Sequence, residues 1–165
     1  PLNEISRSLH EFSWVKNVNL STNFKNKLFV EIIEYIPTGL LSYNNQLFYF
    51  SKDGKVIDKF TANDQKKFII FYGKQVLKEA NNLLSKLDKL EQINMIMINE
   101  AHYINERRWD VKLDNDIILN LSEKNIEESI NNYINLIAKF KNEQIISIKN
   151  IDLRNNEKAI INFKK

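Results

Sequence analysis

The chain has 165 residues, of which 43% are hydrophobic and 27% are charged, and its formal net charge is +3. This composition supports a folded core of one medium or two small domains and excludes an intrinsically disordered segment. The absence of cysteine excludes disulfide bonds, thiolate catalysis and cysteine-based zinc sites, and the small, dispersed basic excess does not indicate a nucleic-acid-binding face.

The chain opens with the pattern of a helix and then of a strand. The helix is predicted from three apolar residues at helical spacing, Ile5, Leu9 and Phe12. Residues 28–36 alternate in the manner of a β-strand, and we expect Pro37 and Gly39 to close this strand.

A β-hairpin is predicted next. Residues 47–50 and 56–57 flank the turn 51–54, where Gly54 suits a backbone with positive φ. Residues 1–60 are therefore predicted to form one helix and three strands.

Residues 61–165 are predicted to hold two helices among several strands. The first helix spans about 73–90, and its buried face carries Val76, Ala80, Leu83, Leu84 and Leu87. The second is expected to begin at Ser122 as its N-cap, with an apolar stripe of Ile126, Ile130, Tyr133, Ile134 and Ile137. The Glu residues that follow Ser122 favour the positive end of a helix dipole.

The strands of this second part follow from alternation. One buried strand is predicted at 93–98, and a hairpin joins 109–113 to 117–121 around the turn 114–116. Two closing strands are predicted at 145–154, with an irregular middle, and at 159–163. The fold class is therefore predicted as α+β with a mostly antiparallel sheet.

No catalytic or metal-binding pattern is present in the sequence. His10 and His102 are far apart and lack metal-ligand neighbours, so we interpret the first as lying on the polar side of a helix and the second in a connector. Nucleophile-elbow, phosphate-loop and zinc-protease motifs are absent. We therefore expect no enzyme activity, no cofactor, no metal and no small-molecule substrate.

The final strand, 159–163, has two interpretations. A terminal strand often lies at the edge of a sheet, where its unpaired backbone groups accept a strand from another chain. It can equally be an ordinary strand covered within the fold. Residue patterns leave both open.

Six segments, in the same order, resemble the FtsQ/DivIB family of bacterial cell-division proteins. They are 9–18 (LHEFSWVKNV), 28–37 (LFVEIIEYIP), 47–56 with its Asp-Gly turn, 72–74 (YGK), 107–121 (RRWDVKLDN, then ILNL) and 151–154 (IDLR). The segment 107–121 is the most specific of the six.

The resemblance implies a partial POTRA domain at 1–60, with a helix and a three-stranded sheet, and a C-terminal β domain at 61–165. It implies that a strand and a helix of the POTRA domain, a single inner-membrane helix and a cytoplasmic tail lie upstream, with this region in the periplasm. The implied partners are the FtsB-like and FtsL-like coiled-coil pair, and other divisome components through the POTRA part. The alternative is a POTRA-type receptor or chaperone module of an outer-membrane assembly or secretion system.

The resemblance also implies a partner-binding surface after the DLR motif. The corresponding residues are Arg154, Asn155, Glu157 and Phe163, and the strand from Ala159 through Ile161 to Phe163 would accept a partner strand. Phe163 would be the hydrophobic anchor, and Arg154 would pair with partner carboxylates. Asn155 and Glu157 depart from the Tyr and Ser expected there. Either Arg107 or Arg108 would also face the partner, and strand alternation favours Arg108 as the exposed one.

Overall fold

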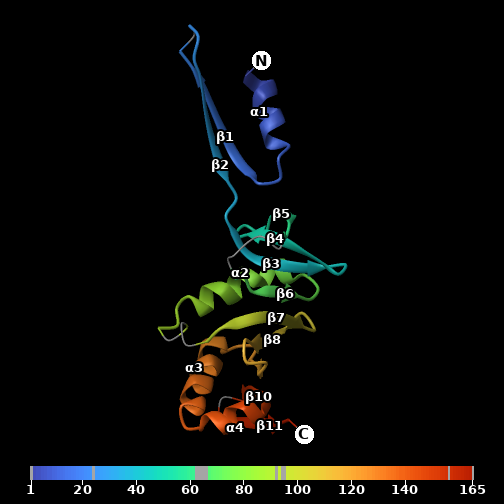
Figure 1. The fold of residues 1–165 in the computed structure, drawn as a ribbon, viewed down its shortest axis with the longest axis vertical. Coiled ribbons are helices and arrows are strands. Elements are labelled where there is room, and N and C mark those ends of the chain that lie inside the picture. Colours follow the sequence, from blue (N-terminus) through green and yellow to red (C-terminus); the bar gives the residue numbers. More distant parts are fainter. Residues whose placement is uncertain are drawn as a thin grey trace.

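A nine-stranded sheet makes up most of the computed structural model, and a two-stranded ribbon with one helix extends from one end of it (Figure 1). The structure describes residues 2–23, 25–61, 67–91, 93, 96–155 and 157–164. The tip of the ribbon and the C-terminus lie at opposite ends of the molecule. Helices and a large sheet together confirm the predicted α+β class.

The ribbon consists of β1 (Val15–Thr22) and β2 (Leu28–Glu34), which pair antiparallel, and α1 (Leu2–His10) lies beside them. Only Val15 and Val18 of these strands are buried. The strand β1 was not predicted, because its outward positions Asn17, Asn19 and Ser21 interrupt the apolar pattern.

The expectation of a three-stranded sheet beside α1 is wrong. The strands at residues 37–43, 46–51 and 56–59 belong to the nine-stranded sheet, whereas residues 28–34 belong to the ribbon. The chain therefore passes from one sheet to the other between Glu34 and Pro37. The division of the chain into domains at residue 60 stays a prediction.

The nine-stranded sheet has the order β11-β10-β9-β8-β7-β6-β3-β4-β5. Its strands are β3 (Pro37–Tyr43), β4 (Gln46–Ser51), β5 (Val56–Lys59), β6 (Ile70–Tyr72), β7 (Ile98–Ile104), β8 (Arg108–Leu113), β9 (Ile118–Asn120), β10 (Ile148–Asn155) and β11 (Lys158–Phe163). Neighbours are antiparallel except at β9–β10, β6–β7 and β3–β6, which confirms the mostly antiparallel sheet.

One face of this sheet forms the core. The register aligns Phe71, Ala101, Val111, Leu119 and Ile151 across five neighbouring strands, and all five are fully buried. The helices α2 (Val76–Leu87) and α3 (Ile126–Ile137) pack their apolar stripes into the same core, as predicted for both. The opposite face of the same strands carries polar residues, because successive side chains of a strand alternate between faces.

Pro37 and Gly39 do not end a strand, since both lie within β3. Pro37 is its first residue, a position where a strand tolerates proline. A Cβ on Gly39 would lie 2.8 Å from ring carbons of Phe50 and Phe71, so this glycine allows the two rings to pack against the sheet.

Two predicted strands are placed differently. The strand predicted at 93–98 begins only at Ile98, residues 94 and 95 lie outside the described residues, and the Ile96 N–H donates to the Ile93 carbonyl at 2.9 Å. Residues 142–147 form a short helix, α4 (Asn142–Ser147), where the closing strand was expected to begin. The apolar pair Ile145–Ile146 fits either structure, and the strand starts at Ile148.

Ser122 is not the N-cap of α3. The cap position is Asn125, and the buried Ser122 hydroxyl instead accepts the Asn125 N–H at 3.4 Å. His102 also lies outside any connector: it is in β7, where its ring stacks on Tyr72 with centroids 4.5 Å apart.

Candidate partner-binding surface

The strand β11 lies at one edge of the nine-stranded sheet. It pairs with β10 on its inner side, and no strand of the described part of the chain pairs with its outer side. An edge of this kind presents unpaired backbone donors and acceptors to another chain. The final strand is therefore an edge strand, the first of its two interpretations.

The register of β11 against β10 determines which side chains of β11 are exposed for contact with a partner. Ile161 is opposite Ile151 and packs against the core, so it offers a partner only its backbone. Phe163 is opposite the buried Ile148 but remains 51% exposed. Ile160 is opposite Asp152 on the polar face and is 60% exposed.

Arg154, at the end of β10, is held by its neighbour Asp152. The Arg154 Nε donates to both Asp152 carboxylate oxygens, at 2.9 and 3.0 Å, and the backbone N–H of Arg154 donates to the same carboxylate at 3.0 Å. These bonds lower the pKa of Asp152, with the guanidinium as the largest cause, although burial opposes the shift. The pairing orients Arg154 while 53% of its side chain stays exposed.

Of the two adjacent arginines, Arg107 is the exposed one, and the preference for Arg108 was wrong. The Arg107 side chain is 59% exposed and pairs with Glu123 at 3.3 Å. The Arg108 side chain is only 22% exposed and lies 3.5 Å from Asp110. Arg108 shares the polar face of β8 with Asp110, whereas Arg107 precedes the strand in a turn, where alternation does not apply.

A shallow cavity of about 240 Å³ brings the three predicted arginines together. It is lined by Arg107, Arg108, Leu121, Ser122, Glu123, Lys124 and Arg154. Four of these residues are cationic and one is anionic, so the cavity favours a carboxylate-bearing segment. We call these residues the basic cavity.

A second cavity of about 290 Å³ adjoins the edge strand and shares Arg154 with the basic cavity. Its other lining residues are Asp152, Asn155, Lys158 and Ile160. Arg154 therefore connects the basic cavity to the edge strand, and the two features form one continuous surface.

The strands beneath this surface carry acidic and amide side chains in register. Asp110 is opposite Asn120, and Asn120 is opposite Asp152, so a polar row crosses β8, β9 and β10. The Arg108 cation adds to the lowering of the Asp152 pKa, and Asp110 adds to the raising of the Arg154 pKa. The arginines are thus held by fixed carboxylates behind them.

Ser129 positions the loop that forms one wall of the basic cavity. Its buried hydroxyl accepts the Ser122 N–H at 3.0 Å and lies 3.0 Å from the Asn125 carbonyl and 3.2 Å from the Leu153 carbonyl. This one side chain joins α3, the 121–125 loop and β10.

The remaining predicted residues lie at the β10–β11 turn. The Asn155 side chain accepts the Glu157 N–H at 2.9 Å and so shapes the turn, while Glu157 and Ala159 are exposed. Lys124 and Ile160 also line these cavities and were not predicted from the sequence. Strand alternation from Ile161 would have identified Ile160 as its outward neighbour, but nothing in the sequence places Lys124 beside Arg154.

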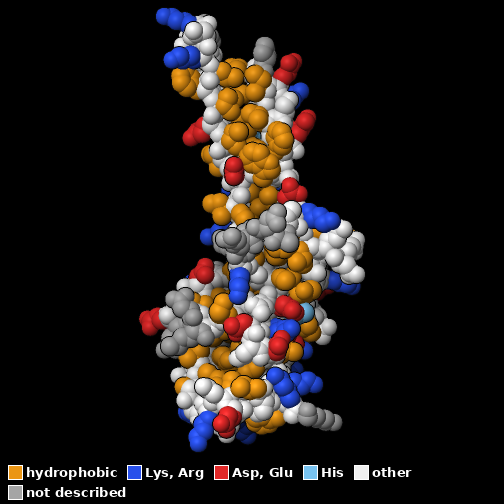
Figure 2. All heavy atoms as spheres, in the orientation of Figure 1, with side chains coloured by type: hydrophobic (Ala, Val, Ile, Leu, Met, Phe, Trp, Pro, Cys, Tyr) orange, Lys and Arg blue, Asp and Glu red, His pale blue; other side chains and the backbone are white. Residues whose placement is uncertain are grey.

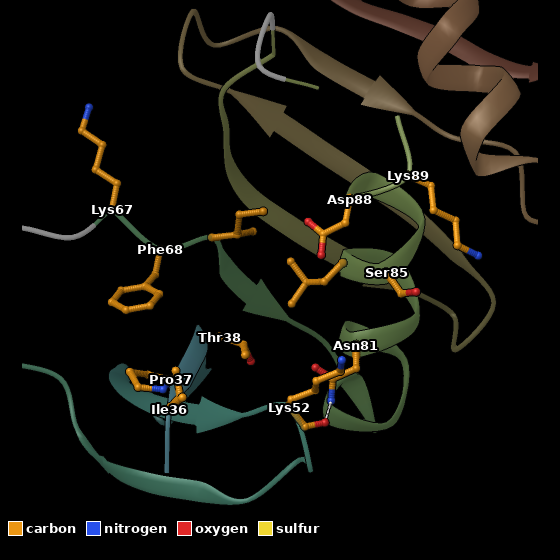
Figure 3. A pocket seen from close by; sticks show the side chains of 12 residues that line it. Ile36, Pro37, Thr38, Lys52, Lys67, Phe68, Asn81, Ser85, Asp88 and Lys89 are labelled. Atoms are coloured by element: carbon orange, nitrogen blue, oxygen red, sulfur yellow. Dashed lines mark hydrogen bonds between the residues drawn. The ribbon is translucent and has the colours of Figure 1, made fainter. Parts of the chain in front are cut away.

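A larger cavity, of about 620 Å³, lies where the ribbon joins the sheet (Figure 3). Asp88, directly after α2, and Thr38 of β3 point into it, whereas Lys67 and Lys89 point away. On its floor the Asn81 amide donates to the Lys52 carbonyl, which ties α2 to the hairpin turn. Its polar groups do not converge on one point, and we assign it no chemistry.

Within the described ranges, no group of three or more metal-ligating side chains comes together. None of the helices that the structure describes has the length and hydropathy needed to cross a membrane.

Comparison with known proteins gives one family. The model of the family "Cell division protein FtsQ/DivIB, C-terminal" matches residues 40–154, which covers most of the nine-stranded sheet. Proteins named "Cell division protein FtsQ" from Rickettsia felis and Rickettsia prowazekii are 28% and 29% identical, each over 97% of this chain and 59% of the relative. One from Rhizobium radiobacter is 25% identical over 94% of this chain and 73% of the relative. The chain thus spans 59% of the length of the Rickettsia relatives.

Proposed function

We propose a function from the family to which this chain belongs, the FtsQ/DivIB family of cell-division proteins. The chain is a non-catalytic scaffold that binds the FtsB/FtsL coiled-coil pair during septum formation. A short β segment of the FtsB-like partner adds to the outer edge of β11, with backbone hydrogen bonds along the strand. Carboxylates of the same segment pair with the basic cavity.

The observation that carries this proposal is the continuity between an open strand edge and a cluster of arginines. Arg154, on β10, lines both cavities, and Phe163 is exposed at the far end of the neighbouring edge strand β11. A segment paired with β11 passes both residues, so one strand supplies an apolar contact and a charged one. The planar guanidinium of arginine can pair with both oxygens of a carboxylate, so it suits this partner better than the ammonium group of lysine.

The same membership supports a proposal for the location of the protein. We propose that the full protein crosses the bacterial inner membrane once, upstream of this region, and that the region lies in the periplasm. The ribbon and α1 belong, on this proposal, to a POTRA unit that contacts other divisome components.

Calorimetric titration with the C-terminal segment of the FtsB-like protein from the same genome tests the proposal. We expect saturable binding that Phe163→Ala weakens by about 30-fold or more, as for an apolar anchor that becomes buried on binding. Arg154→Gln should weaken it as well and reduce its dependence on salt.

Two control variants separate the surface from general effects. Ile36→Ala removes an apolar side chain that is 75% exposed where the ribbon joins the sheet. Lys139→Gln removes an exposed cation that lines neither cavity. Both should bind like the unchanged chain. Equal binding by all four variants would place the partner elsewhere, and no binding by the unchanged chain would contradict the proposed partner.

A further inference from the structure

Two exposed lysines, Lys25 and Lys27, lie near the tip of the β1–β2 ribbon. The Asn23 carboxamide oxygen accepts the backbone N–H groups of Lys25, Asn26 and Lys27 at 3.1, 3.2 and 3.0 Å. The Thr22 hydroxyl donates to the Lys27 carbonyl at 3.0 Å. These bonds hold the backbone of residues 25–27 against Thr22 and Asn23, so both lysines lie at a defined end of the ribbon.

Large apolar side chains follow directly after the lysines. Leu28 is 43% exposed, Phe29 is 56% exposed and Val30 is 46% exposed. Figure 2 shows basic side chains at the tip of the ribbon with hydrophobic side chains next to them. The tip extends past the end of α1 in Figure 1, so the helix does not cover it.

Phe29 lies on the face of the ribbon that points away from α1. The buried Val18 and the half-buried Leu20, on the strand that contacts α1, are opposite Ile32 and Val30, whereas Phe29 is opposite the exposed, polar Ser21. A further helix or strand packed on the face of the ribbon that α1 occupies would therefore leave Phe29 exposed. No acidic residue occurs between Val15 and Val30 in the sequence, so the charge of the tip is uncompensated locally.

Cations beside aromatic and aliphatic side chains match the interface of an anionic bilayer. Lysines pair with the headgroups, and the apolar side chains enter the boundary with the acyl chains. A folded protein partner would need a surface of complementary shape. A lipid interface needs only cationic side chains next to exposed apolar side chains. The two lysines alone raise partitioning onto an anionic surface by roughly 30-fold.

We propose that the ribbon tip, Lys25, Lys27, Leu28 and Phe29, is a contact site for anionic phospholipid headgroups. The contact is weak and reversible, and it orients the long axis of the molecule relative to a bilayer. It rests on the proposed location beside the inner membrane, but it uses the end of the molecule opposite to β11.

Co-sedimentation with vesicles tests this proposal. The probes are vesicles of phosphatidylcholine alone and of phosphatidylcholine with phosphatidylglycerol. We expect the chain to sediment with the anionic vesicles only, and raising salt from about 0.1 M to about 1 M should release it. The double variant Lys25→Glu/Lys27→Glu should lose at least roughly 30-fold in partitioning, and Phe29→Ser should lose several-fold.

The matched control is Lys158→Glu/Lys164→Glu, which reverses two charges at the other end of the molecule and should sediment like the unchanged chain. Equal loss in both double variants would overturn the tip as the site. Sedimentation with neutral vesicles, or none with either kind, would overturn the lipid assignment. The tip variants should still bind the FtsB-like segment in solution, so the two proposals fail independently.

Discussion

The Ser129 hydroxyl on α3 lies 3.2 Å from the Leu153 carbonyl oxygen on β10, in a site that is almost completely buried. The Ser129→Ala variant leaves the buried Ser122 N–H without its acceptor. Because an unsatisfied buried donor costs about 1–3 kcal/mol, the free energy of unfolding should fall by about that amount. Urea denaturation followed by circular dichroism measures the change.

Ser147→Ala is the matched control for this prediction. The Ser147 hydroxyl donates to the Gln144 carbonyl at 2.7 Å, but on an exposed helix end. Its loss should change the free energy of unfolding by about 0.5 kcal/mol or less. If the two variants had the same urea midpoint, Ser129 would not hold the cavity wall as described.

The Asp152–Arg154 pair predicts a dependence of stability on pH. The pKa of Asp152 is lower in the folded protein than its ordinary value, chiefly because of the Arg154 guanidinium. The charged carboxylate therefore stabilises the fold above the unfolded pKa of about 3.9, and this contribution is lost as the pH falls through the lower folded pKa. The difference in unfolding free energy between the unchanged chain and Asp152→Asn should be constant near neutral pH and narrow below about pH 4.

The same pair of urea titrations in an Arg154→Gln background provides the control. Without the guanidinium, the difference in the free energy of unfolding between the chains with Asp and with Asn at position 152 should narrow much less on acidification. An identical pH profile in both backgrounds would show that Arg154 does not cause the shift.

Gly39 predicts an overpacking effect. A methyl group at this position would meet Phe50 and Phe71 at 2.8 Å, so Gly39→Ala should lower the free energy of unfolding by about 1–3 kcal/mol. Phe50→Leu in the same chain makes room, so the double variant should lose less than the sum of the two single changes. Strict additivity in urea denaturation would contradict this packing.

The ribbon should be less protected than the nine-stranded sheet. Every residue of β2 is exposed and α1 has no buried residue, so local opening of this end releases little apolar contact. Limited proteolysis with mass spectrometry should cut within residues 2–34 before it cuts within 98–153. First cleavage inside β7 or β8 would contradict the prediction.

The periodic elements of this fold could be predicted from sequence, and elements with mixed patterns could not. The helices α2 and α3 and the hairpin β8–β9 each repeat apolar residues at one clear period. In contrast, β1 alternates Val and Leu with Asn and Ser at an edge where little is buried, and Ile145–Ile146 fits helix or strand equally. The membership of β3 in the large sheet depends on its parallel pairing with β6, a contact between distant segments that periodicity does not encode.

The candidate site likewise has features that the sequence could predict and features that it could not. Position in the chain allowed an edge for the last strand but left a covered strand equally open, and alternation would have separated Ile160 from Ile161. The meeting of Arg107 with Arg154 required the parallel pairing of β9 with β10, which joins segments about thirty residues apart in the sequence. The exposure of Arg107 instead of Arg108 depends on where β8 begins, and one residue reverses that assignment.

The most direct test of strand addition is amide hydrogen exchange of the chain with and without the FtsB-like segment. We predict that new protection concentrates in β11, residues 158–163, with little change in β5 at the opposite edge of the sheet. Protection at β5, or protection spread over the helices with β11 unchanged, would contradict binding at the C-terminal edge.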